Sequence, residues 1–233
     1  MPLVHIAGQL VLFAHVPRCG GSSVENYLTA RFGPIGFLDR RYFKVGEPER
    51  WSATSPQHLE HAALGRLIPP AWIAHSFALV RHPEDRIVSV FRYQRDLEQR
   101  IPADITLEAW IAGLSEKRAA DPHHLDNHPR PASDLVPEDA TVFRLEDGMA
   151  PVVAWLDQLE GAERMPRSIV ADNAYHARMK KAKREPGPDV AVTAEVRSQI
   201  HDLFAADFAR FGYALRDVSG SEPDGGSKKD ALA

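Results

Sequence analysis

The sequence predicts an α/β protein with a mainly parallel central sheet, because short strand-like runs alternate with segments of helical periodicity. The strand-like runs are residues 10–14, 77–80 and 141–145. The first two are uninterrupted apolar stretches between polar or turn residues, a pattern typical of strands buried on both faces of a parallel sheet. Ligands of such sheets bind beyond the carboxyl ends of the strands, so we expect functional residues directly after these runs.

A glycine loop and then a helix follow the first strand. Residues 15–21 contain two glycines and one proline, and the apolar residues after them fall at helical spacing. These apolar residues are Val24, Tyr27, Leu28 and Phe32. Residues 33–56 have no clear periodicity, and we expect irregular structure there that contacts the substrate. A short helix over 58–67 is predicted next, ended by Pro69 and Pro70.

The second strand leads into a predicted helix that begins at Pro83 and runs to about Glu98. Proline suits the first turn of a helix, and Glu84 and Asp85 complement the helix dipole. Later elements are a helix around residues 107–114, a loop over 121–137, a helix over 151–159 and one amphipathic helix from Val196 to Phe211, ended by Gly212.

Length and composition indicate a folded, soluble protein. The 233 residues, of which 44% are hydrophobic and 26% charged, allow one sizeable core. We predict a single domain over residues 1–216 and a disordered tail over 217–233, where small polar residues dominate. With 28 basic and 32 acidic residues the net charge is −4, so no overall positive field favours a nucleic-acid or membrane partner.

The cysteine content and the hydropathy pattern predict a cytoplasmic protein. Cys19 is the one cysteine, which rules out an internal disulfide and a cysteine zinc site and fits a reducing compartment. The apolar run at residues 10–14 is too short for a membrane span or a signal-peptide core.

The glycine loop is a candidate anion site. Glycines let backbone amides approach an anion, the helix N-terminus adds positive potential, and Arg18 supplies a full charge. Tight glycine turns are common in α/β proteins, so the loop alone leaves both interpretations open. It is not a Walker A loop, because that pattern needs a lysine after its last glycine and Ser22 follows Gly21 here.

Residues 12–24, LFAHVPRCGGSSV, closely resemble the 5′-phosphosulfate-binding loop of sulfotransferases, above all the carbohydrate-type branch with the loop H-[IV]-P-K-T-G-G-[TS]-S. Arg18 stands at the usual lysine and Cys19 at the usual threonine. Arginine keeps the cation and can bind two sulfate or phosphate oxygens, but it cannot donate a proton to the leaving oxygen. The resemblance implies that the donor is held by Arg18, Cys19, Gly20, Gly21, Ser22 and Ser23.

Residues 79–95, LVRHPEDRIVSVFRYQR, resemble the 3′-phosphate-binding element of the same family, VR-x-P-x-x-R-x-x-S. This implies that Arg81, through a charged fork, and Ser89, through its hydroxyl, hold the 3′-phosphate. Arg86 also matches, although pairing with acidic neighbours on its own helix would explain it equally well. Weaker similarities at residues 143–147 and 206–213 extend the resemblance over about residues 10–215.

The resemblance implies a P-loop NTPase-like three-layer sandwich that uses 3′-phosphoadenosine 5′-phosphosulfate as donor without a metal. The acceptor would be a hydroxyl of a small molecule or carbohydrate. Two alternatives remain open. An atypical small-molecule kinase is disfavoured by the missing loop lysine, and a non-catalytic nucleotide-binding module is favoured by the departures at Arg18 and Ala132.

His58 is the candidate general base. Residues 55–59, SPQHL, resemble the stretch that carries a histidine in carbohydrate-type members. A histidine with an ordinary pKa of about 6.5 is mostly neutral near pH 7 and can accept a proton. Glu60 and His61 are the alternatives. Arg18 and the loop amides would stabilise charge on the moving group, so the predicted catalytic pair is His58 and Arg18.

Four other features of the sequence allow a purely structural interpretation as well as a functional one. A histidine cluster could bind a metal, but prolines break its spacing, so no metal is predicted; its members are His123, His124 and His128. Ala132, at a position where the family stretch has glutamine, is expected to line the acceptor pocket. The basic run after Asn173 is either solvated or a lid; it consists of Lys180, Lys181, Lys183 and Arg184. Cys19, at an electropositive helix start that would lower its pKa, is a packing residue or a nucleophile.

Overall fold

The computed structural model describes residues 1–161, 166–171 and 175–216. Within them, four strands form one sheet in the order β1-β2-β3-β4. Strand β2 pairs with β3, and β3 with β4, in parallel, whereas β1 is antiparallel to β2. The strands are β1 (Leu3–Ile6), β2 (Gln9–Ala14), β3 (Ile73–Val80) and β4 (Thr141–Arg144). The predicted α/β class with a mostly parallel sheet is therefore confirmed.

Strand β1 was not predicted. Ala7 and Gly8 join it to β2 with positive φ angles of 48° and 79°, and two such residues form the tight turn that suits the twist of a hairpin. Alanine at a positive φ is uncommon, so the sequence around Ala7 does not indicate this turn. The hairpin places one antiparallel strand at the edge of the sheet.

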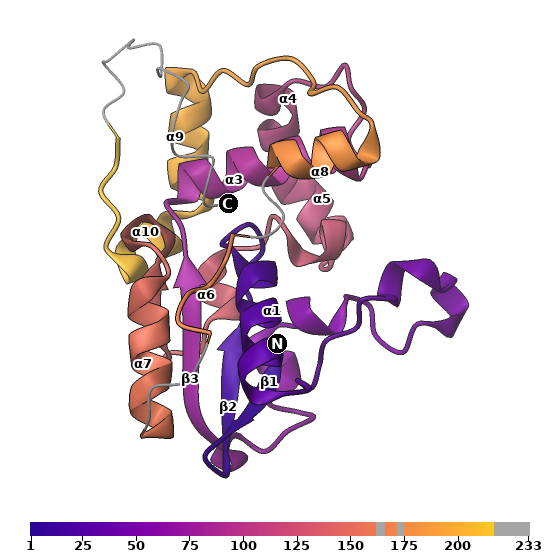
Figure 1. Ribbon diagram of the computed structural model, residues 1–233. Coiled ribbons are helices and arrows are strands. Elements are labelled where there is room, and N and C mark those ends of the chain that lie inside the picture. Colours follow the sequence, from indigo (N-terminus) through magenta and orange to yellow (C-terminus); the bar gives the residue numbers. More distant parts are fainter. Residues whose placement is uncertain (162–165, 172–174, 217–233) are drawn as a thin grey trace.

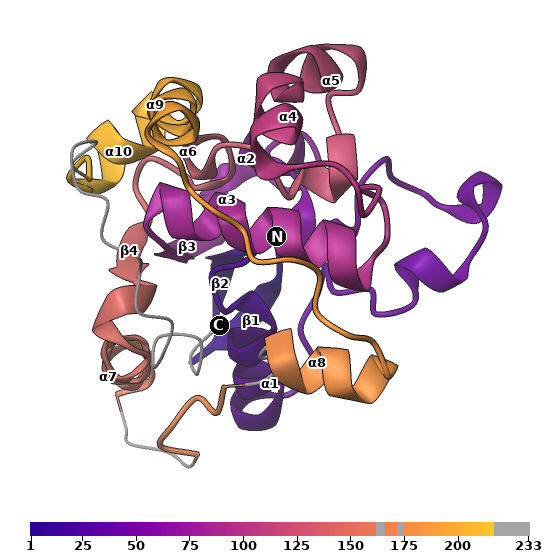
Figure 2. The ribbon, with the colours of Figure 1, turned by 90° about the horizontal axis from the view of Figure 1, so that it is seen from above.

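Helices lie on both faces of the sheet. The two views agree that α1 and α6 lie on opposite faces (Figures 1 and 2), and Figure 2 shows α7 on the face of α1 and α2 on the face of α6. The helices are α1 (Gly21–Phe32), α2 (His61–Leu64), α3 (Pro83–Arg92), α4 (Leu107–Ala112), α5 (Leu114–Ala120), α6 (Ala132–Leu135), α7 (Ala150–Glu160), α8 (Tyr175–Ala182), α9 (Ala194–Leu203) and α10 (Ala205–Phe211). Among the described residues, no helix combines the length and the apolar character that crossing a membrane requires.

Three predicted helices differ from the structure. The helix predicted over 58–67 is shorter, because a 3₁₀ turn over Pro56–His58 precedes the single turn of α2. The helix predicted to reach Glu98 is α-helical only to Arg92 and continues as a π-helix over Tyr93–Leu97. The last amphipathic helix is interrupted at Phe204, whose φ of −120° separates α9 from α10. Gly212 ends α10, as predicted, and it does so with a φ of 64°. The tail 217–233 lies outside the described residues.

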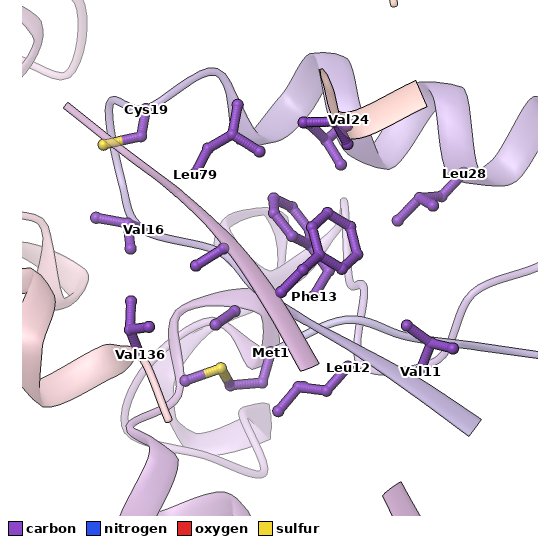
Figure 3. Close-up of a cluster of buried hydrophobic side chains, with 14 of the residues drawn as sticks. Met1, Val11, Leu12, Phe13, Val16, Cys19, Val24, Leu28, Leu79 and Val136 are labelled. Atoms are coloured by element: carbon purple, nitrogen blue, oxygen red, sulfur yellow. The ribbon is translucent and has the colours of Figure 1, made fainter. Parts of the chain in front are cut away.

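Two clusters of buried apolar side chains hold these elements together. The first surrounds the sheet and includes Phe13, Val24 and Leu28 (Figure 3). The second joins α3, α4, α9 and α10 through residues such as Phe91 and Trp110. Helix α3 contributes only to the second cluster, yet it starts at the carboxyl end of β3, so it links the two.

Candidate active site

The loop between β2 and α1 presents unpaired backbone amides at a helix N-terminus. Gly20 caps the 12-residue helix α1 in the left-handed region, with a φ of 77°. In the described part of the chain, the amides of Gly20, Gly21 and Ser22 donate to no acceptor. Free amides at a helix N-terminus attract anions. The predicted anion loop therefore has the donors that it needs.

Gly21 is required by a close approach of the His15 ring. A Cβ atom at this position would lie 2.0 Å from Nε2 of His15. The ring cannot move aside easily, because its Nδ1 lies 2.6 Å from Oε1 of Glu25 and both side chains are buried. Burial lowers the pKa of His15, an effect that Glu25 partly opposes. The imidazole thus packs against the start of α1.

Arg18 joins the two segments that resemble donor-binding elements. Its Nε donates a 3.0 Å hydrogen bond to Oγ of Ser89, and its guanidinium carbon lies 4.6 Å from the centre of the Tyr93 ring. Burial, reinforced by the charges of Arg178 and Arg81, lowers the pKa of Arg18 to about 10. Arg18 is therefore still charged at neutral pH.

Arg81, directly after β3, is half-buried and lies close enough to Arg18 to influence its pKa. Its side chain has no hydrogen bond or ion pair with any described residue. Two neighbouring guanidinium groups without a carboxylate partner favour a ligand with several negative charges.

Arg86 has a structural role, unlike Arg81. It is 1% exposed and donates to the carbonyls of His128, at 3.1 Å, and Arg130, at 2.8 Å. It also lies 3.7 Å from Asp207, which accepts from the amides of Ala132 and Ser133. Arg86 therefore fastens the loop before α6 to α3.

His58 is held by a buried carboxylate from that loop. Its Nδ1 lies 2.7 Å from Oδ2 of Asp126 and 3.1 Å from Oγ of Ser55, and the residue is 7% exposed. Ser55 also donates to both Asp126 oxygens, from its amide and from its hydroxyl. Burial acts to raise the pKa of Asp126, but His58 and these hydrogen bonds hold it well below its usual range.

Two aromatic rings connect His58 with Arg18. The His128 ring meets the His58 ring edge-on at 4.9 Å and stacks on Tyr93 at 5.4 Å, and Tyr93 lies against Arg18. Burial and the neighbouring His58 lower the pKa of His128 to about 3, so this ring is neutral. The structure therefore brings together the predicted catalytic pair and Ser89.

The two alternative bases are placed differently. Glu60 forms an ion pair with Arg130, in which Oε1 lies 2.9 Å from Nη2, and the same oxygen lies 3.5 Å from Nδ1 of His123. His61 starts α2 and is half-buried without a carboxylate partner among the described residues. Of the three candidates, His58 is the one that a carboxylate orients within the site.

The predicted histidine cluster does not form as a group. His123 faces Glu60, whereas His128 joins His58 and Asp126. Ligand-type atoms of His58, Asp126 and His128 lie within 4.8 Å of one another, a separation compatible with a metal ion. Both oxygens of Asp126 already accept hydrogen bonds from Ser55 and His58.

Cys19 is buried and is not an activated thiol. It is 1% exposed, lies in the sheet core with Val16 and Leu79 (Figure 3), and burial raises its pKa to about 12. The expectation of a lowered pKa was wrong, because burial outweighs the nearby arginines. We expect iodoacetamide to label Cys19 at least about 100-fold more slowly at pH 8 in the native protein than in denaturant. Equal labelling rates in a mass-spectrometric time course would contradict this burial.

Ala132 and the basic run after Asn173 lie in different environments. Ala132 is buried in the sheet core at the start of α6, so it packs rather than lines a pocket. The lysines of the basic run are exposed, whereas Arg184 donates to the carbonyls of Asp96 and Leu97. Asn173 lies outside the described residues.

Sequence reasoning missed Asp126, Tyr93 and Arg178 as members of the site. Arg178, from α8, donates to Oη of Tyr93 at 3.2 Å and lies 5.0 Å from its ring centre. One signal was present in the sequence: aspartate and asparagine follow one another at 126–127, and both residue types tolerate left-handed turns.

A family model described as "Sulfotransferase family" matches residues 7–214. Searches of curated proteins and of solved structures returned no match.

Proposed function

Since this chain belongs to the sulfotransferase family, we propose that it transfers a sulfuryl group from 3′-phosphoadenosine 5′-phosphosulfate to an acceptor hydroxyl, with carbohydrates as the candidate acceptor class. We further propose that the layered α/β architecture is P-loop-like. One observation carries the donor assignment: the glycine loop and the Arg81 segment, far apart in sequence, meet at the hydrogen bond from Arg18 to Ser89.

The residues present fit a donor with phosphate groups at two positions. The free amides of the loop and Arg18 suit the 5′-phosphosulfate, because they combine N–H donors with a full charge. Arg81 and Ser89 suit the 3′-phosphate, and Arg81 forms no ion pair with a carboxylate among the described residues. When bound, the donor would supply the activated sulfuryl group.

The chain itself supplies a base and positive charge. His58 accepts the hydroxyl proton of the acceptor at Nε2, because Nδ1 is already directed to Asp126. Arg18 and the loop amides stabilise the negative charge that develops on donor oxygens. Arginine in place of lysine restricts Arg18 to charge stabilisation, since its guanidinium does not deprotonate under these conditions.

We propose that residues 33–56 contact the acceptor. This segment projects to one side of the sheet around residues 40–50 (Figure 1) and carries exposed Phe43 and Trp51. Exposed aromatic rings beside polar groups suit the apolar faces of sugar rings. We propose a cytoplasmic location and neither a metal nor a nucleic-acid partner.

Calorimetric binding of adenosine 3′,5′-bisphosphate without magnesium tests the donor site. We expect dissociation constants in the micromolar range for the wild type and weakening by about 100-fold for Arg81→Ala, since a charge-assisted contact contributes about 1.5 to 3 kcal/mol. AMP, which lacks only the 3′-phosphate, should bind the wild type as weakly as the bisphosphate binds the variant.

Arg66→Ala is the matched control, because Arg66 is exposed and its side chain has no partner among the described residues. It should bind the bisphosphate like the wild type. Preference for ADP in the presence of magnesium would support the kinase alternative. Tight bisphosphate binding without sulfuryl transfer to any of a broad panel of hydroxyl acceptors would support the non-catalytic module.

A further inference from the structure

We propose that Asp126 is the positioning residue for His58: it fixes the imidazole in the tautomer that leaves Nε2 free to accept a proton. This inference rests on the proposed function, because it assigns His58 the role of general base. Asp126 contacts His58 and not the reacting atoms, so its effect passes through the imidazole.

The tautomer follows from the hydrogen bonds. His58, Ser55 and their hydrogen bonds hold the pKa of Asp126 well below its usual range although burial opposes this, so the carboxylate is ionised and can only accept. The short contact between Oδ2 of Asp126 and Nδ1 of His58, at 2.7 Å, therefore requires the proton on Nδ1. A neutral imidazole with this proton has its lone pair on Nε2, which has no hydrogen-bond partner among the described residues.

The backbone at Asp126 is strained toward this contact. Leu125, Asp126 and Asn127 have φ angles of 52°, 57° and 60° in succession. Aspartate and asparagine tolerate the left-handed region better than leucine does, but three successive non-glycine residues in it persist only where their surroundings enforce this conformation. Here the enforced conformation directs a buried carboxylate at the candidate base. A residue with a purely packing role would not require such an unfavourable backbone conformation.

The loop is clamped on both sides of Asp126. Asn127 donates from Nδ2 to the carbonyl of His58 at 2.9 Å, which ties the loop to the backbone of the base itself. Arg86 binds the carbonyls of His128 and Arg130. Because both neighbours of the dyad are fixed, the carboxylate and the imidazole cannot separate without breaking several buried contacts.

The other charged and titratable groups around the dyad leave Asp126 as its dominant partner. Burial lowers the pKa of both flanking imidazoles, and that of His128 falls to about 3, so the His128 ring is neutral beside the dyad. Glu25 faces His58 but is engaged with His15. The groups that face the dyad from neighbouring elements are His15, Glu25, Tyr42, His128 and the amine of Met1, and Arg18 lies near His128.

The proton step is balanced within these residues. The acceptor O–H bond breaks, its proton forms a bond with Nε2 of His58, and the electron pair stays on the acceptor oxygen for attack on sulfur. The imidazole becomes a cation that retains its proton on Nδ1. Asp126 stays ionised and stabilises that cation without taking the proton.

Asp126→Asn tests the role with little change in shape. An amide can donate to Nδ1 and so favours the wrong tautomer, and we expect kcat to fall about 100-fold or more with unchanged bisphosphate binding. The acid limb of the kcat/KM profile should move to lower pH, because loss of the neighbouring negative charge weakens the base. The control Asp134→Asn, an exposed carboxylate near the same loop, should keep wild-type kcat.

Ser55→Ala provides a milder variant if Asp126→Asn does not fold. It removes one hydrogen bond to Asp126 but keeps the Ser55 amide contact, and we expect kcat to fall about 10-fold without the shift of the acid limb, because the charge of Asp126 is retained. An unchanged kcat in this variant, or in folded Asp126→Asn, would overturn the proposal.

A spectroscopic readout separates this inference from the proposed function. In the resting wild type, ¹⁵N chemical shifts of labelled histidine should show His58 protonated on Nδ1, with the signal assigned by its loss in His58→Gln. A proton on Nε2 would overturn the positioning role even in an active enzyme. A proton on Nδ1 together with absent bisphosphate binding would retain the dyad and reject the proposed function.

Discussion

His58→Gln is expected to lower kcat by about 10³-fold while bisphosphate binding stays within about twofold of the wild type. Glutamine keeps a hydrogen-bonding side chain of similar length but has no lone pair able to accept a proton at neutral pH. The donor contacts through Arg18 and Ser89 do not pass through His58, so the binding constant should be unaffected. Initial rates at saturating donor and calorimetry on the same preparation measure the two quantities.

Glu60→Gln and His61→Gln are the matched controls for this prediction. Both lie within three residues of the candidate base in sequence, and we expect each to keep kcat within about threefold of the wild type. A large loss in either variant, combined with a small loss in His58→Gln, would transfer the role of base to that residue. The three variants therefore decide between the candidates that the sequence left open.

Arg86→Ala is expected to reduce the free energy of unfolding by about 3 to 5 kcal/mol. The substitution leaves the carbonyls of His128 and Arg130 without their donor and removes the buried cation nearest to Asp207. It also leaves a cavity against Phe204, whose ring centre lies 5.4 Å from the guanidinium carbon. Urea unfolding followed by circular dichroism measures the change.

Arg81→Ala is the matched comparison within the same sequence motif. Because Arg81 makes no hydrogen bond or ion pair with the described residues, its removal should change the free energy of unfolding by less than about 0.5 kcal/mol. Unfolding midpoints that fall equally in the two variants would contradict the assignment of one arginine to the ligand and the other to the fold.

Much of the fold is readable from apolar periodicity. Strands β2 and β3 and helices α1 and α7 coincide with the predicted elements to within a few residues, because their buried faces are marked by continuous or periodic apolar residues. Strand β4 also coincides, although its residues are mostly exposed. The errors occur where side chains give no such signal. Ala7 adopts a positive φ that alanine rarely adopts, and the break at Phe204 falls inside an unbroken apolar pattern.

The donor-binding residues of the candidate site can be predicted from the sequence, whereas the residues around the candidate base can be predicted only in part. Arg18 and Ser89 lie in local motifs at fixed positions after strands, so their proximity follows from the parallel sheet. Asp126 lies 68 residues from His58, and the long irregular loop that carries it has no periodicity from which a partner can be derived. Its position depends on Arg86 and Asp207, which act through tertiary contacts alone.

The hydrogen bond from Arg18 to Ser89 joins residues 71 positions apart and is made by the side chains of the protein alone. Docking of a nucleotide would therefore require no rearrangement that brings these two halves together. We expect association to be fast and steered by the two arginines, with a rate constant that falls as ionic strength rises and shows no plateau at high ligand concentration. Because the two segments are already in contact, diffusion and charge alone set the rate of nucleotide association. Any slow step of turnover must therefore come after binding.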